Sequence, residues 1–500
     1  MQSRRFRPWF RPASFFLLAA VSTAAYLIVS RLGGFLGFAL DDAWIHQTYA
    51  RNLAQGLQFA FVPGQPSAGS TSPLWTLLVA VGYLIHAPYL AWTYLLGTAV
   101  LGVTGWLAYR LVLSAMPERE GVAWLAGLVV AAEWHMVWAA VSGMETLLFA
   151  ALVLAAFVIS PRQAGWLGLC VGVSILARPD GLTLLPFVVA RLALAGWKGR
   201  SRLAGDVLRL TLGFAAVFLP YLAFNYALAG SVWPNTFYAK QAEYAVLRQW
   251  PLVQRIWLVT LQPFVGAQAL LLPGLGVLAW KAARERRWEM LLPLLWAGAF
   301  LAAYVLRLPA TYQHGRYLMP VIPALVSLGI GGTAQWLRLQ TETAGRAALS
   351  LSRLVSRAWL LAFAVVSVAF WGLGARAYQA DVQIIESEMV QTAQWINQNT
   401  PPEALIAAHD IGALGYFGGR RILDMAGLIS PDVIPLMGDD AGLREWLLRS
   451  HAAYLVIAPG WDYPALVQSL ALTQVYSTHA PYSPAAGGEN MAVYRLGGSP

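Results

Sequence analysis

Long apolar segments separated by short polar loops run through most of this 500-residue chain and restrict its fold more than any other feature. Hydrophobic residues make up 58% of the sequence and charged residues 12%, whereas soluble domains carry about 25% charged residues. A helix needs about 20 apolar residues to cross a bilayer. Eleven crossing helices are therefore predicted at residues 13–36, 88–112, 121–139, 144–160, 163–177, 182–197, 206–225, 256–280, 289–307, 317–336 and 358–375.

The arginine and lysine residues predict how these segments are oriented. Four arginines precede the first segment, and the later basic clusters fall in alternate loops if residues 73–86 do not cross. Since cytoplasmic loops are enriched in Lys and Arg, we expect a cytoplasmic N-terminus and an interfacial position for 73–86. The first segment exceeds the 7–15 apolar residues that are typical of a cleaved signal, so an anchor is predicted. This placement accounts for the net charge of +10 without a nucleic-acid partner.

The end of the chain has a different pattern from the preceding membrane module, which is predicted to cover residues 1–375. A helical pattern runs from Tyr378 to Asn399 and stops at the prolines that follow. Strands alternating with helices then predict a small extracytoplasmic α/β domain over residues 376–500. The apolar runs expected to form its strands are ALIAA, RRILDMAGL, AYLVIAP and MAVYRL.

Two adjacent acids, Asp41 and Asp42, open the first polar loop, predicted at residues 37–87. We expect them at the C-terminal end of the first helix, where the helix dipole disfavours negative charge. Adjacent carboxylates also repel each other, which raises one pKa. The pair would be explained by a positively charged partner, by a bound metal ion, or by a role in accepting a proton. The alternative is that the two acids only mark a solvated boundary at the membrane surface. An amphipathic interfacial helix is predicted to follow, with Trp44, His46, Tyr49 and Arg51 at near-helical spacing.

Further ionisable residues are predicted on the same, extracytoplasmic side. Glu145 begins a predicted span, where it either caps the helix or contacts a substrate. Arg178 and Asp180 either close a tight turn as an ion pair or bind a ligand, because a guanidinium can contact two phosphate oxygens at once. Ionisable groups within membrane segments are costly and are therefore candidates for function.

Two aromatic stretches contribute the other candidate residues. One aromatic stretch contains Asn235, Tyr238 and Lys240. It is suited either to lie at the membrane interface or to bind a phosphate. His314 and Arg316 stand at the start of a predicted span, and Arg316 is the stronger candidate because it enters that span. The sequence shows no zinc-ligand pattern, its single cysteine is expected to be an inert packing residue, and its glycine-rich stretch lacks phosphate-loop spacing.

Taken together, these motifs resemble the multi-span GT-C glycosyltransferases, and the nearest subgroup is the bacterial one that includes cell-wall arabinofuranosyltransferases. The resemblance covers nearly the whole chain in order. It implies a GT-C-like α-helical membrane protein in the bacterial inner membrane, a polyprenyl-phosphate-sugar donor, and an extracytoplasmic C-terminal domain. It leaves a divalent metal open and names no other cofactor. The motifs are DDAWIHQTYARNLAQG, GSTSPLW, SGMETLLF, ARPDG, GSVWPNTFYAK, HGRYLMPVIPAL and DIGALGYFGGRRILDMAGL.

By resemblance, the chain is an inverting transferase whose base is Asp41 or Asp42, with Asp41 favoured. The base removes the proton of an acceptor hydroxyl on a glycan, lipid or protein, and the sugar is not identified. The resemblance implies that the donor phosphate binds Arg178, Lys240 and Arg316. The substrate pocket would then contain Trp44, His46, Tyr49, Arg51, Glu145, Asp180, Asn235, Tyr238 and His314.

Two other functions remain open at this point. A transporter or flippase of lipid-linked sugars would show repeats with interrupted helices at matching positions, and none is visible in the sequence. An O-antigen ligase or polymerase is the second alternative, and it would not require an acid pair after the first span.

Overall fold

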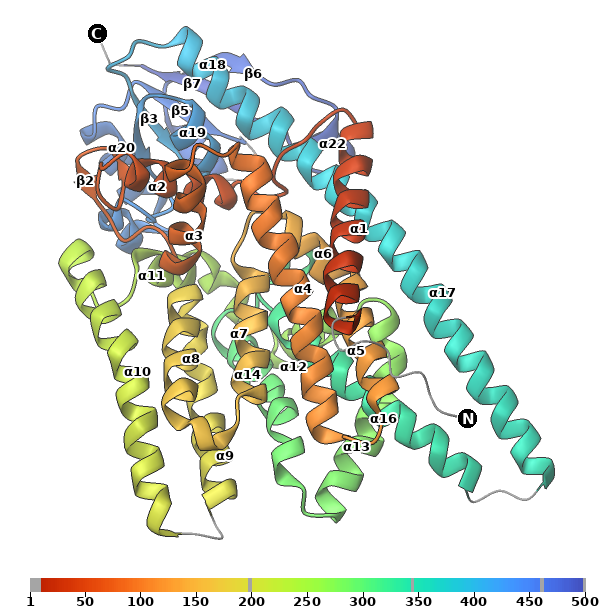
Figure 1. The fold of residues 1–500 in the computed structure, drawn as a ribbon. Coiled ribbons are helices and arrows are strands. Elements are labelled where there is room, and N and C mark those ends of the chain that lie inside the picture. Colours follow the sequence, from red (N-terminus) through yellow and green to blue (C-terminus); the bar gives the residue numbers. More distant parts are fainter. Residues whose placement is uncertain (1–9, 197–199, 343–345, 459–462, 498–500) are drawn as a thin grey trace.

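The computed structural model describes residues 10–196, 200–342, 346–458 and 463–497. Helices form an elongated body, and a small sheet covers one end of it together with the first polar loop (Figure 1). The elements of the first half are α1 (Phe10–Leu32), α2 (Asp42–Ala54), β1 (Ala60–Val62), β2 (Gln65–Pro66), α3 (Pro73–Leu84), α4 (Tyr89–Ala115), α5 (Glu120–Ala132), α6 (Trp134–Val141), α7 (Thr146–Val158), α8 (Ala164–Ala177), η2 (Pro179–Leu184), α9 (Leu185–Gly196) and α10 (Arg200–Ala229).

The second half of the body ends in a long outer helix, α17, that reaches the sheet (Figure 1). This helix exposes apolar side chains along its outer side, including Leu361 and Val368, as expected of a surface that faces lipid. The elements are α11 (Asn235–Glu243), α12 (Leu252–Leu261), η5 (Ala267–Leu271), α13 (Leu272–Arg284), α14 (Leu292–Arg307), α15 (Tyr312–Gly315), η7 (Met319–Val321), α16 (Ile322–Glu342) and α17 (Arg346–Ile385).

Six helices of the described residues are long and apolar enough to cross a membrane, or up to nine spans if each of three bent helix pairs counts as one. The eleven predicted spans are therefore not confirmed. Predicted span 121–139 is bent by 50° between α5 and α6, where Glu133 interrupts the apolar run and caps α6 through Met136 N–H at 3.0 Å. Predicted span 256–280 is bent by 93° near Gly266, whose φ is +129°. Helix α3 is shorter than the about 20 residues that a crossing needs, and the interfacial position of residues 73–86 stays a prediction.

The acid pair lies at the start of α2, which corrects the prediction that it ends the first helix. Helix α1 ends at Leu32, and Gly34, with φ +102°, begins a non-helical segment that reaches Asp41. Asp41 is the N-cap residue of α2, and Asp42 is its first helical residue. The α2 dipole therefore favours both negative charges. The prediction failed because the apolar run continues beyond the glycines that end the helix.

The C-terminal region contains a five-stranded sheet with strand order β4-β3-β5-β7-β6. Strand β3 pairs in parallel with β4 and β5, whereas β7 pairs antiparallel with β5 and β6. Each predicted apolar run contains a strand, and the edge strand β6 was not predicted. The elements are η8 (π-helical, Glu386–Val390), α18 (Gln391–Asn399), β3 (Leu405–Ala408), α19 (Gly412–Phe417), β4 (Arg421–Asp424), η9 (Pro431–Leu436), α20 (Asp440–Arg449), β5 (Tyr454–Ile457), α21 (Pro464–Ser469), β6 (Leu472–Ser477), α22 (Tyr482–Ala485) and β7 (Ala492–Leu496).

The predicted boundary between residues 375 and 376 lies within α17, which continues through η8 into α18. No change in the backbone marks this position. The division of the chain into two domains therefore stays a prediction.

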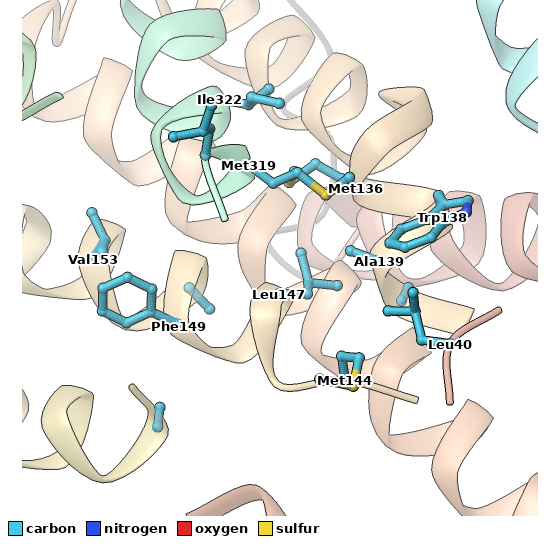
Figure 2. Close-up of a cluster of buried hydrophobic side chains, with 14 of the residues drawn as sticks. Leu40, Met136, Trp138, Ala139, Met144, Leu147, Phe149, Val153, Met319 and Ile322 are labelled. Carbon is cyan, nitrogen blue, oxygen red and sulfur yellow. The ribbon is translucent and has the colours of Figure 1, made fainter. Parts of the chain in front are cut away.

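One apolar cluster packs the elements that carry the ionisable candidates. Leu40, directly before the acid pair, belongs to the same buried cluster as Met144, directly before Glu145 (Figure 2). Met319, three residues after Arg316, belongs to it as well. Buried apolar contacts thus bring together three segments that are distant in the sequence, at positions close to their charged residues.

Candidate active site

A cavity of about 510 Å³ lies between α2, α11, α14 and the segment that leads into α16. The first polar loop also lines it, and so does Leu428 of the C-terminal region. Seven of the residues predicted from the sequence come together in the lining: Asp42, His46, Glu145, Arg178, Asp180, Lys240 and Arg316. The other seven predicted residues belong to the described part of the chain but do not line the cavity: Asp41, Trp44, Tyr49, Arg51, Asn235, Tyr238 and His314.

Arg316 enters the cavity directly after a left-handed turn in which Gln313 and His314 have φ of +54° and +59°. Its Nη2 forms an ion pair with Asp42 Oδ2 and donates a hydrogen bond to the Tyr317 hydroxyl at 3.1 Å. Within the described chain, the Nε and Nη1 atoms have no hydrogen-bond partner, although the side chain is only 4% exposed. An unpaired buried donor costs about 1–3 kcal/mol. These two guanidinium nitrogens therefore have unused donor capacity in a residue that lines the cavity.

Arg178 lies on another side of the cavity, where α8 ends and Pro179 begins η2. Its Nη2 donates to Asp180 Oδ2 at 2.7 Å and to the Tyr304 hydroxyl at 2.9 Å. Its Nη1 lies 3.4 Å from Glu145 Oε1. The ion pair across the turn is thus present, and Arg178 also lines the cavity, so its contact with a ligand phosphate stays a prediction.

His46 and Glu145 form a second pair in the lining, with 3.3 Å between His46 Nε2 and Glu145 Oε2. The other ring nitrogen of His46 lies 3.2 Å from Thr76 Oγ1 and 3.3 Å from Ser70 Oγ. Apart from this ion-pair contact with His46, Glu145 Oε2 is buried and has no further partner among the described residues.

Lys240 comes from α11, on the same side of the cavity as Arg316. Its Nζ lies 3.1 Å from Glu243 Oε2 and 5.5 Å from the centre of the Tyr244 ring. Thr236, one turn earlier on the same helix, has a buried hydroxyl without a partner in the described part of the chain. Helix α11 therefore adds a cation and a free hydroxyl to the lining.

The two adjacent acids have different surroundings. Asp41 is buried and accepts hydrogen bonds from the backbone N–H of Gly412 at 2.7 Å and of Ala413 at 2.8 Å. Burial raises the pKa of Asp41 to about 7, although these hydrogen bonds act to lower it. Burial also acts on Asp42, but the positive charges of Arg316, Lys240 and His46 together outweigh it and hold the pKa of Asp42 well below its usual range. Only Asp42 lines the cavity.

The predicted residues outside the lining connect elements of the structure. Arg51 donates to the Tyr416 carbonyl at 2.8 Å, and Trp44 packs against Phe417 with ring centres 4.7 Å apart. Tyr238 is 38% exposed. The remaining contacts join Tyr49 OH to Ser67 Oγ at 2.6 Å, Asn235 N–H to the Ala68 carbonyl at 3.1 Å, and His314 Nε2 to Asp381 Oδ2 at 2.8 Å.

Several residues of the lining were not predicted from the sequence. Tyr304 donates to Asp180 Oδ2 at 2.6 Å, but in the sequence it is one aromatic residue within an apolar span. Arg307, three residues later, also lines the cavity. As the charged residue at the end of that predicted span, it was the only sequence feature there that pointed to a site. Leu428 gave none, because only the tertiary structure brings the C-terminal region to the cavity.

The described residues contain no group of three His, Cys, Asp or Glu side chains placed to hold a metal ion. Asp42 and Asp180 are instead paired with arginines of the chain itself. This donor set does not fit a metal ion held by the protein, and no step proposed below uses one.

Comparison with known proteins gives one family match and a set of similar structures. A domain of unknown function, DUF8728, matches residues 375–494. No curated protein matches the chain significantly.

The similar structures extend over nearly the whole chain. ArnT from Cupriavidus metallidurans bound to undecaprenyl phosphate has a TM-score of 0.62 at 15% identity, covering 96% of this chain and 97% of ArnT. The apo oligosaccharyltransferase of Archaeoglobus fulgidus has a TM-score of 0.60 at 12% identity, covering 98% of this chain and 75% of that one. The archaeal oligosaccharyltransferase AglB in complex with an inhibitory peptide and a dolichol-phosphate has a TM-score of 0.55 at 11% identity, covering 93% and 73%.

At these identities the likeness establishes the architecture of the chain. It agrees with the apolar helices that are long enough to cross a membrane. The motif resemblance found in the sequence is confirmed at the level of the fold. The chain has the overall fold of ArnT and of the archaeal oligosaccharyltransferase.

Proposed function

We propose that this chain is an inverting membrane glycosyltransferase that moves a sugar from a polyprenyl-phosphate donor to an extracytoplasmic acceptor glycan, lipid or protein. One observation carries the proposal: Arg316 lines the cavity, is buried beside Asp42, and has two guanidinium nitrogens without a hydrogen-bond partner among the described residues. Such a site offers binding groups for an anion next to a carboxylate. The bound undecaprenyl phosphate of ArnT and the dolichol-phosphate of AglB support a lipid phosphate as that anion.

The donor phosphate is proposed to bind between Arg316 and Lys240. A guanidinium can bind two phosphate oxygens in parallel, and an ammonium adds a second positive charge. Arg178 lines the same cavity, but its charge is already matched by Asp180 and Glu145, so the proposal rests on Arg316 and Lys240 for the phosphate. Cations held in place in this way stabilise the charge that develops on the leaving phosphate.

The acid pair Asp41–Asp42 is proposed to supply the general base. A carboxylate takes the proton of the acceptor hydroxyl, and the acceptor oxygen bonds to the anomeric carbon. The bond between that carbon and the phosphate oxygen breaks, and its electron pair stays on the phosphate beside Arg316. Attack from the face opposite the phosphate inverts the anomeric centre through a transition state that resembles an oxocarbenium ion. Asp42 Oδ1 is suited to this contact, since no described residue forms a hydrogen bond with it.

The test uses purified protein in lipid with undecaprenyl phosphate as the first probe. We expect the wild type to bind it and Arg316→Gln to bind at least about tenfold more weakly, because each hydrogen bond to a charged group contributes about 1.5–3 kcal/mol. Arg162→Gln is the matched control, because Arg162 is exposed and far from the cavity lining. Equal affinity in the wild type and Arg316→Gln contradicts the proposed phosphate site.

The same preparation is then offered a panel of polyprenyl-phosphate sugars with acceptor glycans. Removing a general base costs about 10²–10⁴ in rate. We therefore expect transfer to fall by about that factor in Asp41→Asn, Asp42→Asn or both, while the binding of undecaprenyl phosphate is kept. Undiminished transfer in both variants removes the acid pair from the mechanism.

A further inference from the structure

The C-terminal region reaches the acid pair through its backbone. Both carboxylate oxygens of Asp41 are used in this contact: Oδ2 accepts from Gly412 N–H at 2.7 Å and Oδ1 from Ala413 N–H at 2.8 Å. Asp41 is 8% exposed, so little water competes for these bonds. Because Asp41 and Asp42 are adjacent, this contact also determines where Asp42 enters the cavity.

The contact at Gly412 leaves no room for a side chain. A Cβ atom at this position would overlap the Asp41 carbonyl oxygen and lie 2.7 Å from its Oδ2. A second close approach lies at Gly69 of the lining, where a Cβ atom would lie 2.8 Å from the Leu428 carbonyl oxygen. Both glycines thus allow the C-terminal region to pack directly against the backbone of the first polar loop.

The opposite end of α19 is held by the same helix, α2. Arg51 donates to the carbonyls of Tyr416 at 2.8 Å and Gly415 at 3.3 Å, and it lies 4.7 Å from the centre of the Tyr416 ring. Trp44 packs between these two contacts against Tyr416. The Asp41 carboxylate therefore lies at the start of α19 and the Arg51 guanidinium at its end. These two charges are opposite in sign to the ends of the α19 dipole that they face.

The sheet is fixed to the long outer helix at a separate point. Glu388 of η8 is buried and accepts hydrogen bonds from Asn490 Nδ2 and Met491 N–H, both at 2.8 Å. Thr478 also donates to this carboxylate. The C-terminal region is thus attached both at α2 and at the outer helix.

We propose that residues 409–428, within the region matched by the domain of unknown function, form a fixed wall of the active site. In this wall, Gly412 and Ala413 are positioning residues that hold the Asp41–Asp42 pair beside the cavity. The inference rests on the proposed function and assigns this region a part in transfer rather than in holding the donor phosphate.

The test is Gly412→Ala in the full-length protein, with Gly372→Ala as matched control, because a Cβ atom at Gly372 would meet open space. We expect Gly412→Ala to lower the kcat of transfer at least tenfold and to leave the affinity for undecaprenyl phosphate within about twofold of wild type. The phosphate-binding cations lie on other elements, so their geometry is kept. Gly372→Ala is expected to match the wild type in both measurements.

Arg51→Met provides an independent variant at the other end of α19. It should show the same loss of kcat with kept affinity, and Arg51→Lys should restore part of the rate because a lysine can still donate to the carbonyls. The inference is overturned if both Gly412→Ala and Arg51→Met transfer sugar at the wild-type rate. It is also overturned if kcat and affinity fall together with the melting temperature, which indicates a purely structural role. A wild-type protein that neither binds undecaprenyl phosphate nor transfers sugar overturns the proposed function instead.

Discussion

At the residue scale, two neighbours with the same side chain have different surroundings. Successive residues of a helix point about 100° apart, so the start of α2 directs Asp41 to the backbone of α19 and Asp42 to the cavity. Burial is the largest single influence on the pKa of each acid. It raises the pKa of Asp41, whereas at Asp42 it is outweighed by Arg316, Lys240 and His46 together. The repulsion expected between adjacent acids is therefore a minor influence on either pKa.

The raised pKa of Asp41 predicts how transfer depends on pH. Because burial raises this pKa to about 7, the side chain gains a proton as the pH falls through that value. A protonated carboxyl cannot act as a base. It also accepts two backbone N–H bonds less well than a carboxylate does. We expect kcat to decrease below about pH 7 in the wild type. The decrease should vanish in Asp41→Asn, which has no carboxyl group.

The measurement is a kcat profile from about pH 5.5 to about 8.5 at saturating donor. Arg162→Gln, at an exposed site, serves as the control and should follow the wild-type curve. A wild-type rate that stays constant across this interval shows that the charge of Asp41 does not matter for transfer.

At the element scale, the turn before η7 determines the direction of Arg316. Gln313 and His314 both adopt left-handed backbone conformations, which cost a residue with a side chain about 1–2 kcal/mol each. The contact of His314 with Asp381 at 2.8 Å holds this turn against α17, and Asp381 also accepts from Trp138 Nε1 at 2.8 Å. Strain in the turn is thus balanced by contacts outside the cavity.

The left-handed turn predicts opposite effects of two substitutions at Gln313, an exposed position where packing contributes little. Gln313→Gly should leave the melting temperature unchanged or raise it, since glycine adopts positive φ freely. Gln313→Val should lower the free energy of unfolding by about 1–2 kcal/mol, because a β-branched residue disfavours this conformation. Thermal unfolding in detergent measures both. Equal stability of the two variants contradicts the left-handed assignment.

At the scale of the whole molecule, the sheet, α2 and α11 lie toward one end of the helical body (Figure 1), and α2 and α11 both contribute residues to the cavity lining. The basic loops predict that this end is extracytoplasmic. Gln65 is exposed in the first polar loop, and Gln163 is exposed in a loop predicted on the cytoplasmic side. The single native cysteine, Cys170, is buried and provides little background.

Cysteine labelling in intact cells tests this orientation. We expect a membrane-impermeant maleimide to label Gln65→Cys and to leave Gln163→Cys unlabelled until the membrane is opened. The two glutamines are matched, since both are exposed and lie outside the apolar helices. Labelling of Gln163→Cys alone would place the cavity in the cytoplasm and contradict an extracytoplasmic acceptor.

Local pattern predicted a large part of the fold and of the candidate site. Apolar runs predicted where most helices lie, and the α3 segment is shorter than the helices that are long enough to cross a membrane. Arg178, Lys240 and Arg316 were selected because isolated cations near apolar segments are costly, and all three line the cavity. The bends near Glu133 and Gly266 were missed, because an apolar count does not detect a capping acid or a glycine turn.

The sequence by itself determined the membrane-helix class, the resemblance to a glycosyltransferase fold, and an acid pair followed by cations. These properties depend on composition and short-range order, which a chain carries before it folds. Only the tertiary structure decided that Asp41 is held by Gly412, that Asp42 meets Arg316, and that Leu428 lines the cavity. Each contact joins segments hundreds of residues apart, and it forms because packing of the apolar core brings their backbones together.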